Sequence, residues 1–158
     1  MGDKKNLLGF TLIELMMIVA ISGIMAGISV PLYGKLSDAS KLNETVELIS
    51  QEIALTRARA SIRLKNSSYG IYFEINPDDN DRIVLYEGDS YLARDEDKDR
   101  AFVLDKEISL SSSITDNDLH FSSGLVAPSA VGDLIIRQRN GDVTTIKIND
   151  LGIPLTIK

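Results

Sequence analysis

The chain has 158 residues, of which 44% are hydrophobic and 25% charged, with a net charge of −6 and no cysteine. This composition excludes a disordered chain, because such chains combine low hydrophobicity with high net charge. The acidic balance argues against non-specific nucleic-acid binding, and the lack of cysteine excludes disulfides, thiol nucleophiles and cysteine-based zinc sites.

The N-terminal segment consists of a polar leader and a long apolar run. The leader, MGDKKNLLG, occupies residues 1–9, and the run at residues 10–31 contains one acid, Glu14. As a helix rising about 1.5 Å per residue, the run matches a hydrocarbon core about 30 Å thick. A secretory signal peptide would be shorter and would end at a small-residue cleavage site. We therefore predict a transmembrane helix at 10–31, in which Glu14 needs a partner because charge inside a membrane is costly.

Three residues of this run bear on helix packing. Gly23 and Gly27 form a GxxxG pair, a spacing that lets membrane helices approach closely. Pro31 lacks a backbone N–H, so it should kink the helix or interrupt its hydrogen bonding. We predict helix contacts at the glycines and a kink at the proline.

The register of Gly9, Phe10 and Glu14 ahead of an apolar run resembles the processing segment of type IV prepilins and type II secretion pseudopilins. The resemblance implies that a prepilin peptidase cuts between Gly9 and Phe10 and methylates the new N-terminus at Phe10. It also implies that Glu14 pairs with the Phe10 amino group of a neighbouring subunit during assembly. Opposite charges attract strongly at low dielectric, so this pair would set the axial register of the filament.

Residues 32–66 follow an amphipathic helical pattern. Apolar residues recur at intervals of three, four or seven, which predicts one stripe along a helix. The stripe consists of Leu36, Ala39, Leu42, Val46, Ile49, Ile53, Ala60 and Leu64. A stripe of this kind needs a cover, and the sheet expected from residues 67–158 would supply it.

Residues 67–158 are typical of short strands separated by turns. We expect strands at residues 69–75, 83–87, 101–104, 119–122, 134–139, 143–149 and 153–157. Asn140 and Gly141, between two of these strands, are a hairpin signal. The prediction is an α+β, pilin-like fold in which a long N-terminal helix, half transmembrane and half amphipathic, packs on an antiparallel β-sheet or small β-sandwich.

The sequence offers little for catalysis. The only histidine, His120, lies in a predicted strand, and no GxSxG, HExxH or phosphate-binding glycine loop occurs. We therefore expect no enzyme and no cofactor.

A metal site has one candidate. Asp95, Asp97 and Asp99 alternate like the start of a calcium loop, but Arg100 and Lys106 stand where that loop needs glycine and glutamate. We expect solvated loops, with calcium at the three aspartates as the alternative.

The C-terminal region resembles the minor pseudopilin H and its minor-pilin relatives, in the segments ALTRARASIRLKNSSYGIYF, LHFSSG and NGDVTTIKINDLGIPLTIK. The resemblance implies a structural pseudopilin of a type II secretion apparatus that drives protein export. It would be a single-pass protein of the bacterial inner membrane with a periplasmic globular domain. Its implied partners are a prepilin peptidase, other pseudopilins or pilins, an inner-membrane assembly platform, and membrane lipid before assembly.

Two alternatives remain open. One is a minor pilin of a type IV pilus, acting in adhesion, motility or DNA uptake. DNA capture would use the basic residues Arg57, Arg59, Arg63, Lys65, Arg137 and Arg139. Because the whole chain is acidic, we expect no nucleic-acid partner. The other alternative is a single-span membrane protein unrelated to filaments, which would not be processed at Gly9.

Overall fold

The computed structural model describes residues 10–157, and the side chains of all of these except residues 28–38. One long helix, α1 (Leu12–Ser61), precedes a region of strands and short 3-10 helices. The chain divides into two units, residues 1–39 and residues 40–158, and α1 runs from the first into the second.

The first unit contains the N-terminal part of α1. The helix is continuous through Pro31, and no break separates the predicted 10–31 and 32–66 helices. Beyond Ser61 the backbone of Arg63 turns into the left-handed region at φ 53°, which ends α1. A separate 3-10 turn, η1 (Leu64–Asn66), follows.

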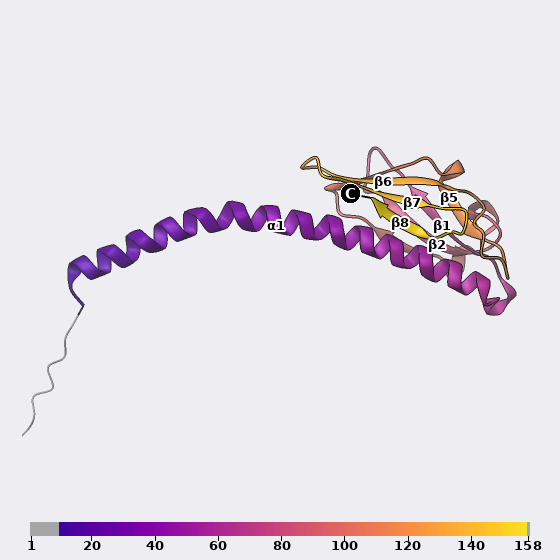
Figure 1. The fold of residues 1–158 in the computed structure, drawn as a ribbon, viewed down its shortest axis with the longest axis horizontal. Coiled ribbons are helices and arrows are strands. Elements are labelled where there is room, and N and C mark those ends of the chain that lie inside the picture. The colour runs from indigo at the N-terminus through magenta and orange to yellow at the C-terminus, as the bar shows by residue number, and fades with distance from the viewer. Residues whose placement is uncertain (1–9, 158) are drawn as a thin grey trace, which may run out of the picture. The chain divides into compact units, whose positions relative to one another are not determined.

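The second unit combines the rest of α1 with two four-stranded antiparallel sheets (Figure 1). One sheet has the order β3-β2-β1-β5 and the other β4-β6-β7-β8. The strands of the first sheet are β1 (Tyr69–Glu74), β2 (Arg82–Glu87), β3 (Arg100–Val103) and β5 (Asp118–Phe121). Those of the second are β4 (Ile108–Ser112), β6 (Gly132–Gln138), β7 (Val143–Ile148) and β8 (Pro154–Ile157). The loops carry the 3-10 helices η2 (Tyr91–Ala93), η3 (Glu96–Lys98) and η4 (Thr115–Asn117).

A single apolar core joins α1 to both sheets. Ile49 and Ile53 of α1 are fully buried against Phe73 of the first sheet and Ile136 of the second, among other residues of one cluster. The helix therefore covers sheet surface with the stripe that its periodicity predicts, and the predicted α+β fold is confirmed. The helix on two antiparallel sheets is consistent with a pilin-like fold.

The two ends of the predicted stripe need correction. Ala39 is exposed, and Leu64 is 41% exposed because α1 has already ended before it. Thr56 is buried instead, one turn before Ala60. The side chain of Leu36 lies outside the described residues.

The predicted hairpin at Asn140 and Gly141 is confirmed. It joins β6 to β7, and Gly141 has a φ of +100°, a conformation that glycine adopts without strain. The Gln138 N–H donates to the Asp142 carbonyl at 2.8 Å, which closes the turn.

One strand was not predicted. β4 pairs with β6 through Leu110 opposite Ile136, and its sequence ISLSS holds only two apolar residues. Serine has little preference for strands, so the alternation of Ile108 and Leu110 was the only local signal.

Candidate functional site

The predicted processing residues lie at the start of the described chain. Gly9 lies outside the described residues. Phe10 is the first one described; it precedes α1, and its side chain is 83% exposed. The chain on the C-terminal side of the predicted cleavage point is therefore open to solvent in the isolated subunit.

Glu14 lies in the first turn of α1 and forms a reciprocal cap with Thr11. The backbone N–H and the hydroxyl of Thr11 both donate to Glu14 Oε2, each at 3.1 Å, and the Glu14 N–H donates to Thr11 Oγ1 at 3.3 Å. This arrangement is a capping box, which satisfies donors that a helix start leaves unpaired. The sequence TLIE fits the pattern Thr-x-x-Glu, so the cap could have been predicted from sequence and was not.

The start of α1 presents an exposed, largely apolar surface in the described part of the chain. Every described side chain from residue 10 to residue 27 is exposed, including those of Met16, Ile18 and Ile24. An added Cβ at Gly23 or Gly27 would meet no atom within 4 Å, so both glycines leave the helix surface open. A contiguous apolar surface of this kind marks a site of protein or lipid contact.

No helix in the described part of the chain is long and apolar enough to cross a membrane. The predicted membrane span is therefore not confirmed. The helix contacts predicted at Gly23 and Gly27 and the kink predicted at Pro31 stay predictions.

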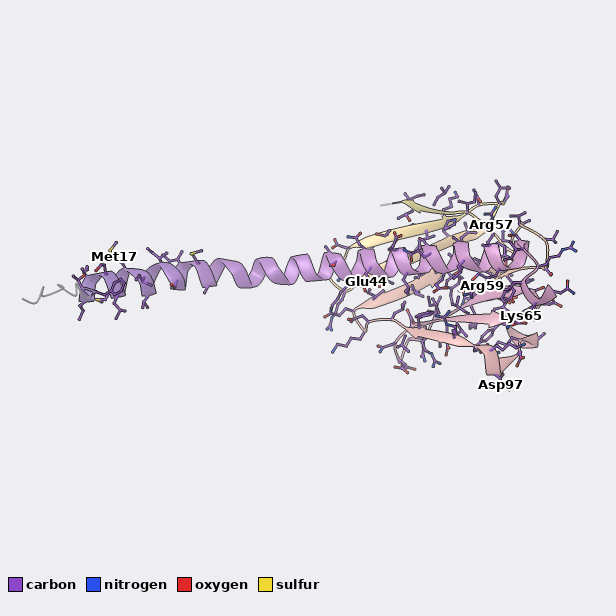
Figure 2. All side chains as sticks on the ribbon, turned by 90° about the horizontal axis from the view of Figure 1, so that it is seen from below. Met17, Glu44, Arg57, Arg59, Lys65 and Asp97 are labelled. Carbon is purple, nitrogen blue, oxygen red and sulfur yellow. The ribbon has the colours of Figure 1, made fainter. Side chains whose placement is uncertain are left out.

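A basic cleft of about 410 Å³ lies in the second unit, where the end of α1 and η1 meet the first sheet. Antiparallel pairing places Leu85 opposite Arg100 and Tyr69 opposite Glu87, so these residues line one face. The other lining residues are Arg59, Leu64, Lys65, Tyr86 and Lys98. Figure 2 shows Arg59 and Lys65 near each other, at the other end of the domain from Glu44.

The cleft carries excess positive charge even though it contains one acid. Glu87 Oε1 accepts a hydrogen bond from the Ser67 hydroxyl at 2.6 Å and lies 3.5 Å from Lys98 Nζ. The Ser67 bond first, and then the charge of Lys98, hold the pKa of Glu87 below its usual value of 4.5. Glu87 is thus ionised at neutral pH and already bound by Lys98. Arg59 and Arg100 have no carboxylate within ion-pair distance among the described residues.

The basic cluster considered from the sequence is divided between different surroundings. Arg59 and Lys65 line the cleft. Arg57 lies beside Gly152, and Arg63 lies beside Gly124. Only two of these four basic residues therefore line the cleft, and Lys98 and Arg100 supply its other positive charges. These two residues are far from Arg59 in sequence, so the sequence alone did not predict the grouping.

The aspartates considered for calcium bind basic side chains. Asp99 lies 2.7 Å from Arg94 Nε, and Asp95 lies 2.8 Å from Lys98 Nζ. Asp97, labelled in Figure 2, is exposed on η3. Within the described residues no group of three or more acidic, histidine or cysteine side chains is arranged to hold a metal ion. The loop is ordered by ion pairs between its own charges.

The face of the first sheet that points away from the cleft is covered by residues 88–99. The Tyr91 ring stacks on Tyr72 with centroids 3.7 Å apart, and the Arg94 guanidinium lies 3.8 Å from the Tyr91 ring centre. The Tyr86 hydroxyl donates to Asp118, which also accepts the Tyr91 N–H at 3.0 Å. This polar cluster fixes the loop that supplies Lys98 to the cleft.

His120 is part of the same face. It lies on β5 as predicted, partly buried, with Nδ1 3.9 Å from Asp118 Oδ2. Its surroundings are those of a strand residue packed beside a carboxylate.

Comparison with known proteins identifies one feature of the chain. Residues 4–30 match the family model described as the prokaryotic N-terminal methylation motif. Comparisons with curated proteins and with solved structures found no match. The motif supports a type IV prepilin-like protein and indicates a structural subunit. It implies processing by a prepilin peptidase and assembly with other pilins.

Proposed function

We propose that this chain is a structural pseudopilin of a type II secretion apparatus. After cleavage between Gly9 and Phe10, it would assemble through α1 into a short periplasmic filament that drives protein export. The observation that carries the proposal is the methylation motif at residues 4–30, followed by a helix start whose described side chains are all exposed. A surface of that kind needs a partner, and identical helices of neighbouring subunits would supply one.

Glu14 would set the register of this assembly. Cleavage would free the Phe10 amino group, and Glu14 follows Phe10 closely in the same segment of each subunit. In a low-dielectric helix bundle, a carboxylate of one subunit and an amino group of the next attract strongly at the correct axial offset and lose that attraction elsewhere. Gly23 and Gly27 would allow close approach between the helices.

The proposed location is the bacterial inner membrane, with the domain of residues 40–158 on the periplasmic side. Before assembly, membrane lipid would cover the apolar start of α1, and an inner-membrane assembly platform would deliver the subunit to the filament. The absence of cysteine supports a pseudopilin over a pilin with a disulfide-closed C-terminal loop. The net charge of −6 also disfavours a DNA-binding pilin.

The proposal is tested by the intact mass of the full chain after co-expression with a prepilin peptidase. We expect loss of residues 1–9 and addition of one methyl group at Phe10. Gly9→Val should block cleavage, whereas Gly2→Val makes the same change elsewhere in the leader and should be cleaved normally. An unprocessed wild-type chain, with the peptidase active on a control substrate, would exclude the prepilin class.

The second candidate is a minor pilin of a type IV pilus, including the kind used in DNA uptake. The basic cleft favours it, since a phosphate backbone binds clustered cationic side chains, and Arg59, Lys65 and Arg100 form no ion pair among the described residues. DNA affinity that falls steeply with salt, and that is lost in the Arg59→Ala/Arg100→Ala variant, would favour this candidate over the pseudopilin. No measurable affinity at low salt would exclude DNA uptake through the cleft.

A further inference from the structure

The basic cleft lies at one end of the hairpin formed by β1 and β2. Its cations Arg59, Lys65 and Arg100 form no ion pair among the described residues, whereas Lys98 is held by Asp95 and Glu87. Leu64, Leu85 and Tyr69 line the same cleft and form its apolar part. The Tyr69 hydroxyl donates to the Leu64 carbonyl at 3.0 Å, which fixes the wall formed by η1.

The turn between β1 and β2, residues 76–81, contains three aspartates and no basic residue, although Arg82 follows it and Lys106 lines the same hollow. Asp78 and Asp79 are exposed there, and neither forms an ion pair within the described part of the chain. The turn is held in shape from below by Asp81, which is 6% exposed. Asp81 Oδ1 accepts the Asn76 N–H at 2.8 Å, and Oδ2 accepts the Leu110 N–H at 2.6 Å.

The acidic turn and the basic cleft lie at opposite ends of the same hairpin. Tyr69 and Glu87, at one end, line the cleft, while Glu74 and Arg82, at the other end, lead into the turn. β1 has six residues, so at the rise of an antiparallel strand its ends are about 17 Å apart. The turn of one chain therefore cannot reach the cleft of the same chain.

We infer that the acidic turn of residues 76–81 in one copy docks in the basic cleft of the next copy. The contact joins different surfaces of two identical domains, so it repeats in one direction and does not close into a dimer. Such a contact suits a filament, and the inference rests on the proposed assembly function. Two exposed aspartates on this turn complement Arg59, Lys65 and Arg100, which form no ion pair among the described residues, because opposite surface potentials align partners.

A long polyanion fits these observations less well than a second copy. The whole chain has a net charge of −6, so outside the cleft the surface repels an extended phosphate backbone. The cleft is also small, about 410 Å³, which accommodates a few side chains. A turn with two exposed aspartates suits a cleft of that size.

The inference can be tested by site-specific cross-linking, because the chain has no cysteine of its own. Leu64→Cys places a thiol in the cleft and Asn80→Cys places one in the turn, and neither removes a charge. Full-length chains carrying one or the other would be expressed together with the peptidase and the assembly components. We expect a heterodimeric disulfide between the two variants and a ladder of oligomers when both cysteines are in one chain.

Charge reversal supplies the decisive control. Asp78→Lys/Asp79→Lys should reduce the cross-link at least tenfold, as should Arg59→Glu/Arg100→Glu, and chains carrying one set should cross-link with chains carrying the other. Glu44→Lys/Asp150→Lys makes the same charge change at other exposed acids and should leave the yield unchanged. Loss in both reversals without rescue in the mixture would overturn the inference.

A reporter on α1 separates this inference from the proposed function. Met17→Cys, joined by a bifunctional thiol reagent, reports helix packing alone. Helix cross-links without the cleft-to-turn cross-link would overturn the docking inference and leave the assembly function standing. Absence of both would overturn both, and a Leu64→Cys cross-link only to another protein would overturn the assignment of a second copy as the occupant.

Discussion

The ring of Tyr86 lies directly over Gly70, its partner on the neighbouring strand, in the space that a side chain at position 70 would occupy. The absence of a Cβ there lets the ring lie flat across β1, with its hydroxyl on Asp118. A glycine inside a strand usually weakens it, but here the glycine allows close packing of an aromatic side chain.

Gly70→Ala should therefore destabilise the domain. The added methyl would collide with the Tyr86 ring, and overpacking of this kind costs about 1–3 kcal/mol. Urea denaturation should show a lower midpoint for this variant. Gly70→Ala/Tyr86→Ala is the control, because removal of the ring should make the alanine harmless relative to Tyr86→Ala alone. If Gly70→Ala lowered the free energy of unfolding equally in the wild-type and the Tyr86→Ala proteins, a collision with the Tyr86 ring would be excluded.

Asp81→Asn should also destabilise the domain, although it changes little in size. Its carboxylate accepts two backbone N–H groups, and an amide would direct its own NH₂ at one of them. Loss of a hydrogen bond to a charged group costs about 1.5–3 kcal/mol. Asp79→Asn, two residues earlier and exposed, should have almost no effect on the thermal midpoint. Similar midpoints for the two variants would refute a structural role for Asp81.

Alkaline pH should unfold the domain partly through Tyr86. Burial first, and then the bond to Asp118, raise the pKa of its hydroxyl above the ordinary value of 10.0. Burial shifts the pKa of Tyr69 and Tyr91 in the same direction. Because the folded state favours the neutral phenol, Tyr86 makes its full contribution to the free energy of unfolding below about pH 10. That contribution is lost as the pH rises further.

The check compares wild type with Tyr86→Phe by urea denaturation at about pH 8 and about pH 11. The variant should be less stable at the lower pH by about 1.5–3 kcal/mol, the value of one hydrogen bond to a charged group. It should also lose less stability between the two pH values. An identical loss in both proteins would show that Tyr86 does not contribute to the slope.

Thr11 and Glu14 should separate capping from charge in filament assembly. Glu14→Gln keeps an oxygen that can accept from Thr11, because glutamine also serves in a capping box, but it removes the charge. Thr11→Val removes the hydroxyl and keeps the charge, at a cost of about 1 kcal/mol to the helix start. We expect Glu14→Gln to insert in membranes and assemble poorly, and Thr11→Val to assemble. The yield of helix cross-links through Met17→Cys measures assembly of each variant. If Glu14→Gln assembled better than Thr11→Val, the charge of Glu14 would not set the register.

Calcium should leave the thermal stability of the domain unchanged. Asp95 and Asp99 already bind Lys98 and Arg94, so an ion would have to displace two cations. Thermal unfolding with calcium and with a chelator should give the same midpoint. Arg94→Ala should lower the midpoint with or without calcium, because the guanidinium also stacks on Tyr91. A midpoint that rises with calcium would restore the calcium alternative.

The helix and most strands could be predicted because their periodicity is local. Residues such as Ile49 and Ile53 recur at the helical interval whatever packs on them, and Asn140 with Gly141 specifies a turn by its own backbone preference. β4 had only the alternation of Ile108 and Leu110 as a signal, since serines occupy the rest of it.

The loop-covered face and the cleft depend on strand register. The continuous apolar run Ile83, Val84, Leu85 and Tyr86 does indicate a strand buried on both faces, and it could have predicted a cover for the second face. The sequence does not show which segment forms that cover, or that Arg59 and Arg100 line the same cleft. Both depend on how distant segments pair in the folded chain. The capping pair at the start of α1 was readable from four adjacent residues.

That capping pair has a consequence for the order of events in assembly. Both donors of Thr11 go to the same oxygen of Glu14, so the side chain is held in one rotamer within the isolated subunit. Immobilising a free side chain at an interface costs about 0.5–1.5 kcal/mol, and here that loss of rotamer entropy occurs when the helix forms. Each incoming subunit would then carry a Glu14 carboxylate whose conformation is already fixed. The rate of subunit addition would depend on how often the helices collide, more than on the time that the side chain needs to find its bound conformation.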